Sequence, residues 1–163
     1  MKHTLLFGAF FLGALSLFAQ KPLPSAQVKS LDGKTLNVQS LGTAQKVTVV
    51  SFWATWCSPC KKELDAIMDY YADWQKQYNV ELIAVSVDDT RTAAKIPAMV
   101  AEKGWKYTIL HDYNKEFQQK ANVTSVPHTL LVNEAGQIVW EHVGYAPGDE
   151  LELEERIKEA TGK

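Results

Sequence analysis

The chain has 163 residues, 46% of them hydrophobic, with 17 basic and 19 acidic residues and a formal net charge of −2. This near-neutral balance excludes the strongly basic surface on which nucleic-acid-binding proteins and polybasic membrane anchors depend. The sequence has no internal repeat and no low-complexity segment, and its length suits one domain with a hydrophobic core. We therefore expect a single domain whose partners are not nucleic acids.

The first nineteen residues have the pattern of a secretory signal peptide. Lys2 and His3 give a short basic start, residues 4–18 form an uncharged apolar run, and Ala19 offers a small residue at the cleavage point. The apolar run is shorter than the roughly 20 residues that cross a bilayer, which makes an uncleaved anchor the less favoured alternative. We expect cleavage after Ala19 and a periplasmic or secreted protein.

This pattern divides the chain into three parts. Residues 1–19 are the expected signal peptide, residues 20–25 form a short linker that contains Pro22 and Pro24, and residues 26–163 form the domain. Export agrees with the presence of a cysteine pair further along the chain, since disulfides persist outside the cytosol. We expect the exported domain to be a monomer.

The domain begins with a hairpin and a buried strand. Residues 28–38 alternate weakly around the turn Asp32-Gly33-Lys34, which is typical of a small β-hairpin. Residues 47–52 are β-branched and almost wholly apolar, which predicts a strand covered on both faces. A helical segment begins soon after this strand, and the only two cysteines of the chain lie at the junction.

Cys57 and Cys60 form a C-x-x-C pair at this junction. Unpaired N–H groups and the positive end of a helix dipole stabilise a thiolate, which is the reactive form of cysteine. A structural disulfide is a poor alternative because it would close a loop of only Ser58 and Pro59. A structural zinc ion needs four ligands, and none of the four histidines stands at zinc-finger spacing. The pair predicts thiol–disulfide exchange with no metal and no other cofactor.

The helix and the strand that follows it complete a βαβ unit. Apolar residues recur at intervals of three and four positions from Leu64 to Tyr78, which predicts an amphipathic helix. Residues 80–87 form a second buried strand. Its connection through the helix implies that the two strands are parallel and that the crossover is right-handed.

The rest of the chain continues the alternation of helices and strands. Pro97 lies inside the helical segment at 89–103, so this helix either starts late or bends at the proline. The remaining elements are a strand at 107–110, a short helix at 115–121, a hairpin of 128–133 with 138–142, and a helix at 149–160. This order predicts an α/β fold in which a mixed sheet is flanked by helices on both faces.

Several motifs resemble those of the thioredoxin superfamily. They are the segment at 52–60, Glu63, the segment Ser125-Val126-Pro127-His128-Thr129, the turn at 133–136 and Gly144. The C-x-x-C-x-x-E spacing is similar to that of exported thioredoxin-like reductases of the TlpA/ResA type. The resemblance covers about residues 25–160. It implies a thioredoxin-like fold with an N-terminal β-hairpin and an inserted αβ unit.

The resemblance also implies roles for individual residues. Cys57 corresponds to the exposed nucleophile that attacks a partner disulfide, and Cys60 to the resolving cysteine that releases the partner. Pro127 matches the cis-proline beside the disulfide, and Val126 would offer its backbone to an extended substrate segment. The other expected substrate contacts are Trp56, Ser58 and Pro59.

Glu63 follows Cys60 by three residues and therefore lies on the same side of the helix. In proteins of the TlpA/ResA type, a carboxylate near the resolving cysteine can accept and return its proton. Plain thioredoxin has an aspartate on the strand instead, at a position similar to Ser51. The resemblance implies a proton-relay role for Glu63, and the alternative is an acidic residue that the helix dipole favours in an early turn.

These features imply an exported thiol–disulfide oxidoreductase that acts on partner proteins. The resemblance implies a reductase fed by a membrane-embedded electron donor, for cytochrome c maturation or for reduction of envelope disulfides. Disulfide oxidases and isomerases use the same scaffold and are an alternative. A peroxiredoxin-type peroxidase is disfavoured because Ala54 stands where its threonine would, three residues before Cys57. A metal-binding chaperone that uses the cysteine pair is an alternative of another class.

Overall fold

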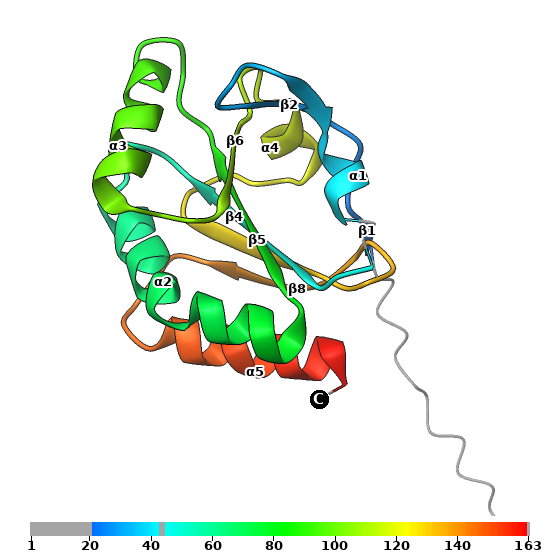
Figure 1. Cartoon of the computed structure of the whole chain (residues 1–163). Helices are drawn as coiled ribbons and strands as arrows, with labels where there is room; N and C mark the ends of the chain where they lie inside the picture. The colour runs from blue at the N-terminus through cyan, green and yellow to red at the C-terminus, as the bar shows by residue number, and fades with distance from the viewer. Residues whose placement is uncertain (1–20, 43–44, 163) are drawn as a thin grey trace, which may run out of the picture.

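The computed structural model describes residues 21–42 and 45–162 of the chain. The expected signal peptide and its cleavage point lie outside these residues. Within them, one eight-stranded sheet carries helices on both faces (Figure 1). This is the layered α/β architecture that the alternation of strands and helices predicted, so the predicted fold class is confirmed.

The sheet has the strand order β1-β8-β7-β4-β5-β6-β2-β3. Strands β4, β5 and β6 are parallel and the other neighbours are antiparallel, which makes the sheet mixed. Every residue of β4 and β7 is buried, because these central strands are covered on both faces. The strands are β1 (Lys21–Pro22), β2 (Gln27–Ser30), β3 (Thr35–Asn37), β4 (Thr48–Trp53), β5 (Glu81–Ser86), β6 (Thr108–His111), β7 (His128–Val132) and β8 (Gln137–Val143).

The helices cover the sheet as two unequal layers (Figure 1). The long α2 and the C-terminal α5 lie side by side on one face, where the Tyr78 hydroxyl donates to Glu154 at 3.1 Å. Helices α1 and α4 lie on the other face. The helices are α1 (Val38–Gly42), α2 (Ser58–Tyr78), α3 (Ile96–Lys103), α4 (Glu116–Lys120) and α5 (Asp149–Thr161), with a short 3₁₀ helix, η1 (Ala93–Lys95), before α3.

Aromatic side chains fix the end of β4 from both sides of the sheet. Phe52 and Trp53 are neighbours in β4 and therefore point to opposite faces. Phe52 packs against Phe117 of α4 with ring centroids 4.7 Å apart, and Trp53 meets Trp105 edge-on at 5.1 Å. All four rings are buried. The cysteine segment therefore leaves β4 from a rigid point.

Most of the predicted elements are confirmed. β2 and β3 form the expected antiparallel hairpin, and β4 and β5 pair in parallel through α2. The helix that contains Pro97 starts late rather than bending: Pro97 lies in the first turn of α3, where its missing N–H removes no helical hydrogen bond.

Two elements differ from the expectation. The segment expected to be a linker contributes β1, in which Lys21 pairs with Ile138 and Pro22 with Gln137, and the following Leu23 is buried. Helix α1 follows β3 without a break. Neither a two-residue strand nor a five-residue helix is long enough to show a hydrophobic period. β1 pairs with two residues at the outer edge of β8 and so covers part of that edge.

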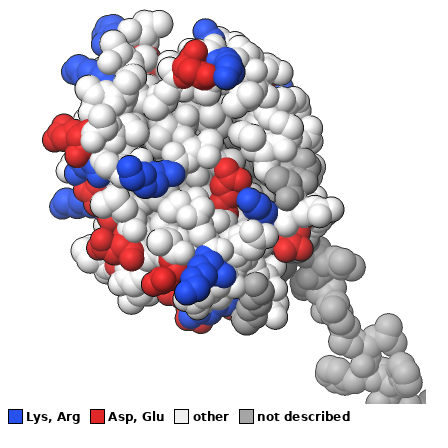
Figure 2. All heavy atoms as spheres, viewed as in Figure 1, with Lys and Arg blue, Asp and Glu red and all other residues white. Residues whose placement is uncertain are grey.

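Basic and acidic side chains are interspersed over the face drawn in Figure 2, in keeping with the small net charge. No helix within 21–42 and 45–162 is both long enough and apolar enough to cross a bilayer.

Candidate active site

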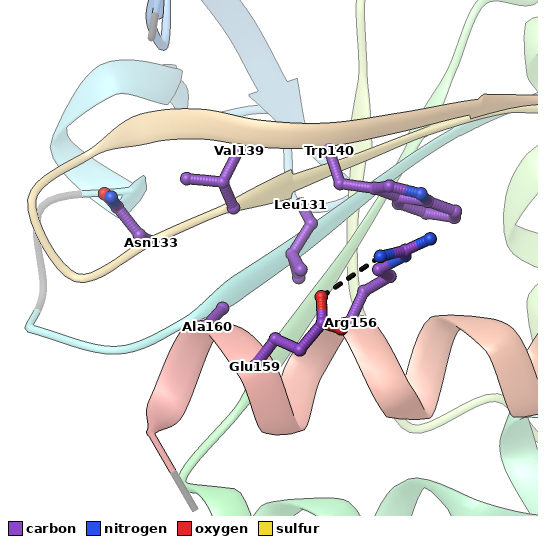
Figure 3. Close-up of a pocket in the computed structure, with 7 residues that line it drawn as sticks. All are labelled: Leu131, Asn133, Val139, Trp140, Arg156, Glu159 and Ala160. Atoms are coloured by element: carbon purple, nitrogen blue, oxygen red, sulfur yellow. Dashed lines mark hydrogen bonds and ion pairs between the residues drawn. The ribbon is translucent and has the colours of Figure 1, made fainter. Parts of the chain in front are cut away.

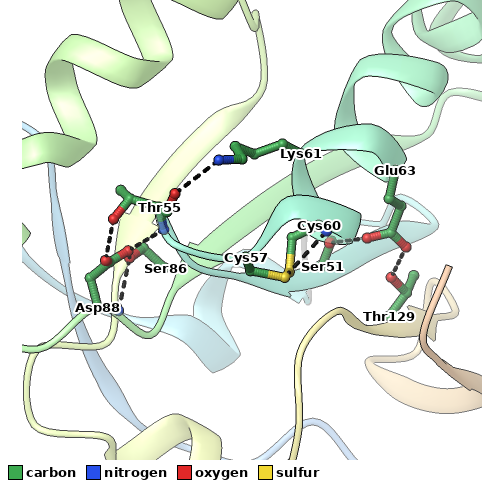
Figure 4. Close-up of a disulfide and its surroundings, with 9 residues drawn as sticks. All are labelled: Ser51, Thr55, Cys57, Cys60, Lys61, Glu63, Ser86, Asp88 and Thr129. Carbon is green, nitrogen blue, oxygen red and sulfur yellow. Dashed lines mark hydrogen bonds between the residues drawn. A yellow bond between two sulfur atoms is a disulfide. The ribbon is translucent and has the colours of Figure 1, made fainter. Parts of the chain in front are cut away.

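Cys57 is the N-cap residue of α2 (Figure 4). Its backbone is extended, with φ −88° and ψ 103°, and its sulfur accepts a hydrogen bond from the Cys60 backbone N–H at 3.2 Å. Pro59 stands in the first turn, where a proline is well tolerated. The sulfur of Cys57 therefore lies at the positive end of a 21-residue helix, which stabilises negative charge on it.

Cys57 and Cys60 are joined by a disulfide, with their Cα atoms 5.4 Å apart. Cys57 is less exposed than the resemblance implied: its exposed fraction is 4%, whereas Cys60 is fully buried. The difference still identifies Cys57 as the more accessible of the two cysteines, because only Cys57 has any surface that a partner could reach. In the disulfide form, the nucleophile is recessed below its neighbours.

Exposed residues surround this recessed sulfur. Trp56 is 63% exposed, and Ser58 and Pro59 are exposed as well. Three of the residues predicted to contact a substrate, Trp56, Ser58 and Pro59, thus form an exposed rim around Cys57.

A buried carboxylate, which the sequence did not predict as part of the site, holds the segment before Cys57 (Figure 4). Asp88 accepts hydrogen bonds from the Thr55 backbone N–H at 2.9 Å, the Thr55 hydroxyl at 2.6 Å and the Ser86 hydroxyl at 2.7 Å. Burial alone would raise the pKa of Asp88, but hydrogen bonds, chiefly from Thr55, outweigh it and hold this pKa below its ordinary value. One signal could have pointed to Asp88, because the carboxyl ends of parallel strands meet at one edge of a sheet.

Replacing Asp88 by asparagine is expected to lower the free energy of unfolding by about 2 kcal/mol at pH 7, because Thr55 and Ser86 lose a charged acceptor. The pKa of Asp88 is lower in the folded state, so its contribution is present above the ordinary aspartate pKa and disappears as the pH falls through the folded value. Urea unfolding at pH 7 and in acid measures both effects.

Asp89→Asn is the matched control for this substitution. Asp89 pairs with the exposed Arg91 at 2.7 Å, and exposed pairs contribute little to stability. We expect a change of less than about 0.5 kcal/mol in this variant. Equal losses in the two variants would show that the Asp88 hydrogen bonds do not stabilise the segment before Cys57.

Glu63 lies on α2 one turn beyond Cys60, and only 5% of it is exposed. Its carboxylate accepts hydrogen bonds from the Thr129 hydroxyl at 2.6 Å and the Ser51 hydroxyl at 3.0 Å (Figure 4). Burial raises the pKa of Glu63 to about 7, against the opposing effect of these two hydrogen bonds. A carboxyl group with this pKa can both accept and release a proton near neutral pH.

Ser51, the strand position that the resemblance aligned with the aspartate of plain thioredoxin, contacts Glu63 directly. The carboxylate on the helix therefore reaches the place on the sheet from which a strand aspartate would project. The alternative, that Glu63 is an ordinary exposed acidic residue favoured only by the helix dipole, does not fit a side chain that is buried against two strands.

The Val126–Pro127 peptide is cis, as the resemblance implied for Pro127. Pro127 is buried at the start of β7 and its carbonyl accepts a hydrogen bond from the Gly144 N–H at 2.9 Å. Two residues later, Thr129 contacts Glu63. The strand that begins at this proline therefore leads from the expected substrate segment to the buried carboxyl group.

His128 is buried beside this segment, and neither of its ring nitrogens has a hydrogen-bond partner among the described residues. Its Nε2 lies 3.8 Å from a carboxylate oxygen of Glu141. Burial is the main influence on this group and lowers the pKa of His128. The imidazole is therefore neutral at pH 7, and it forms no ion pair with Glu141 there.

A hollow of about 320 Å³ lies between the β7–β8 hairpin and α5 (Figure 3). Arg156 and Glu159 of α5 line one side of it and form an ion pair with each other at 3.1 Å, and Trp140 of β8 also lines it. None of the predicted site residues lines it. In the part of the chain that the structure describes, no three histidine, cysteine, aspartate or glutamate side chains are grouped so as to hold a metal ion.

A C-x-x-C disulfide at the start of a helix, together with a cis-proline immediately before a strand of a mixed sheet, defines a thioredoxin-like thiol–disulfide oxidoreductase. The comparison with protein families agrees with this class. The chain belongs to the Redoxin family, whose model matches residues 18–157.

Relatives with described activities are similar along most of their length. The thiol-disulfide oxidoreductase ResA of Bacillus thuringiensis is 29% identical over 147 residues, which are 90% of this chain and 82% of that protein. The sporulation thiol-disulfide oxidoreductase A of Bacillus subtilis is 27% identical over 146 residues, 88% of this chain and 86% of that protein. The solution structure of an uncharacterised thioredoxin-like protein from Porphyromonas gingivalis is 40% identical, with a TM-score of 0.76 over 86% of this chain and 92% of that one. The protein is therefore an enzyme of thiol–disulfide exchange, of the ResA type.

Proposed function

We propose that the protein is an exported reductase that passes electrons from the Cys57–Cys60 dithiol to disulfides of partner proteins, with Glu63 as its proton carrier. The observation that carries the proposal is the pairing of a helix-capping disulfide with a buried carboxyl group whose pKa is about 7. The partners are proteins whose disulfides are reduced during cytochrome c maturation or elsewhere in the envelope, and a membrane-embedded donor restores the dithiol.

In the first step, the Cys57 thiolate attacks one sulfur of the partner disulfide. The positive end of α2 and the N–H of Cys60 stabilise the thiolate before the attack. A mixed disulfide forms between Cys57 and the partner, and the second partner sulfur leaves as a thiolate that takes a proton from solvent.

In the second step, Cys60 must lose its proton before it can attack the mixed disulfide. Cys60 is fully buried, so water cannot take the proton directly. Glu63 lies one helical turn away and is about half ionised at neutral pH. Its carboxylate takes the proton, the Cys60 thiolate attacks Cys57, and the partner leaves with its disulfide reduced.

The partner would approach along the exposed rim. Trp56, Ser58 and Pro59 are accessible around Cys57, and the half-buried Val126 precedes the cis-proline. An extended partner segment that pairs with the backbone of Val126 would bring its disulfide across the sulfur of Cys57. Specificity for protein substrates would then come from backbone pairing rather than from a closed pocket.

Export is supported by the signal-peptide pattern of residues 1–19. Edman sequencing or mass spectrometry of the protein secreted by a bacterial host tests it. A mature N-terminus at Gln20 is the expected result.

The direction of electron flow is tested by the reduction potential of the Cys57–Cys60 couple, measured in dithiothreitol buffers through the fluorescence of the neighbouring Trp56. We expect a value near that of thioredoxin, about −270 mV, at which the dithiol can reduce partner disulfides of higher potential. A value near about −120 mV would contradict the reductase and identify an oxidase or isomerase instead.

A further inference from the structure

A narrow crevice leads from the protein surface to Glu63. It lies between α2, β8 and the start of α5, and its walls include Glu63, Thr129, His142 and Asp149. Its volume is about 10 Å³, close to the minimum that a single water molecule needs. Glu63 itself is 95% buried, so this crevice is a short route by which a proton could pass between its carboxyl group and solvent.

Strand register places His142 beside the hydrogen bond of Glu63. Thr129 of β7 and His142 of β8 stand directly opposite each other in the antiparallel pair. Residues opposite each other in such a pair project from the same face, with Cβ atoms about 5 Å apart. Since the Thr129 hydroxyl donates to Glu63, this register brings His142 to the same crevice that the Glu63 carboxyl group lines.

The imidazole is held in one orientation by two neighbours. It stacks on Trp140 with ring centroids 5.6 Å apart and planes 6° from parallel. Its Nε2 lies 3.1 Å from a carboxylate oxygen of Asp149, which also accepts the N–H of Ala146 at 2.7 Å. The His142 side chain is 31% exposed. The His142 side chain is therefore in contact both with solvent and with the crevice that it lines.

Charged and titratable groups face Glu63 from each element packed around it. Burial is the main cause that raises the pKa of Glu63; the positive charge of His142 lowers this pKa and the negative charge of Asp149 raises it. Burial is the main cause that raises the pKa values of Tyr107 and Tyr145, and the charge of Glu63 contributes in the same direction. Glu150 of α5 also lines the crevice, where it accepts the Tyr145 hydroxyl at 2.9 Å.

We propose that His142, oriented by Asp149 and Trp140, carries the proton between the buried carboxyl group of Glu63 and solvent. The proposal rests on the proposed role of Glu63. It adds a residue 79 positions further along the chain to the proton path of the resolving step.

During reduction of a partner, the proton of the Cys60 thiol passes to the Glu63 carboxylate, and the Cys60 thiolate forms the bond to Cys57 while the bond from Cys57 to the partner breaks. The partner sulfur leaves as a thiolate and takes a proton from solvent. Glu63, now a carboxylic acid, gives its proton through the crevice to the imidazole of His142. The imidazolium, stabilised by Asp149, releases it to water, and Glu63 is again a carboxylate. Two electrons pass from the dithiol to the partner disulfide.

The test uses the reduced protein and dithionitrobenzoate. Attack by Cys57 releases a first coloured thiolate, and resolution by Cys60 releases a second, so stopped-flow absorbance separates the two steps. We expect His142→Ala to slow the second phase by about tenfold in dilute buffer at pH 7 and to leave the first unchanged. Added imidazole should restore the second phase, because it can enter the space left by the side chain and carry the proton.

Two further variants separate the possible outcomes. Glu141→Gln changes the adjacent, exposed residue on the opposite face of β8 and should leave both phases unchanged. In Glu63→Gln, the second phase should be slow, unaffected by a further His142→Ala substitution and insensitive to imidazole. A normal second phase in Glu63→Gln would refute the proposed function of Glu63. Two outcomes would overturn the role of His142 alone. In the first, the second phase is slow in Glu63→Gln but normal in His142→Ala. In the second, the second phase is slow in His142→Ala and imidazole does not restore it.

Discussion

Replacing Cys60 by serine is expected to abolish turnover and to leave Cys57 covalently bound to its partner. Cys57 retains its place at the helix N-terminus and can still attack a disulfide. A serine hydroxyl is far too weak an acid and nucleophile to displace the partner from Cys57, so the mixed disulfide accumulates. We expect turnover to fall by about 10³-fold or more, measured as reduction of insulin disulfides with dithiothreitol as the electron source.

Cys57→Ser is the matched control for this experiment. It also removes the disulfide, so any loss of stability is shared by the two variants. It should abolish turnover without trapping a partner, since Cys60 is fully buried and cannot reach an external disulfide. Mass spectrometry of each variant after exposure to a disulfide peptide distinguishes them. Equal trapping by both variants would contradict the assignment of Cys57 as the nucleophile.

Replacing Glu63 by glutamine is expected to slow the resolving step by about 10²-fold at pH 7, because the amide cannot accept the proton of Cys60. In the unchanged protein, the rate of this step should rise with pH through the pKa of Glu63, about 7, as the carboxylate forms. The variant should lack this inflection. Stopped-flow measurement between pH 5 and pH 9 compares the two profiles, and Glu102→Gln, an exposed residue of α3, is the control.

The same substitution is expected to make the protein more stable in alkaline solution. The pKa of Glu63 is raised from 4.5 to about 7 on folding. The unchanged protein therefore loses stability as the pH rises between these values, because the carboxyl group ionises more readily in the unfolded state than in its buried place in the fold. Glutamine carries no charge at any of these pH values. Urea unfolding at pH 8 should show Glu63→Gln more stable by about 2 kcal/mol, and the difference should vanish near pH 4. A less stable variant at pH 8 would show that burial of the ionised Glu63 carboxylate does not destabilise the folded protein.

Local patterns were enough to predict the elements that surround the disulfide. The apolar run at 47–52, the cysteine pair and the periodic helix up to Tyr78 lie consecutively in the chain, and each has its own sequence signal. Pro127 could be placed beside the disulfide only through the resemblance, because a cis bond has no local signal of its own.

Contacts between distant segments had no such signal. Asp88 and Thr55 are 33 residues apart, and Glu63 and Thr129 are 66 apart. Whether two such residues meet depends on how strands align, and a shift of one residue in register would turn every side chain to the other face. For this reason the resemblance implied a role for Glu63 in proton transfer, but the sequence did not indicate that Thr129 and Ser51 donate hydrogen bonds to its carboxylate.

The sequence alone determined the α/β order, the redox pair and the helix that activates it, since these follow from residue type, hydrophobic period and spacing. Only the tertiary structure decided which groups surround that pair. It paired β1 with β8, buried Asp88 behind the Cys57 segment and set His142 opposite Thr129. Burial also decided the acidity of Glu63, because the pKa of a carboxyl group depends on the solvent it loses and the partners it gains, which no local pattern encodes.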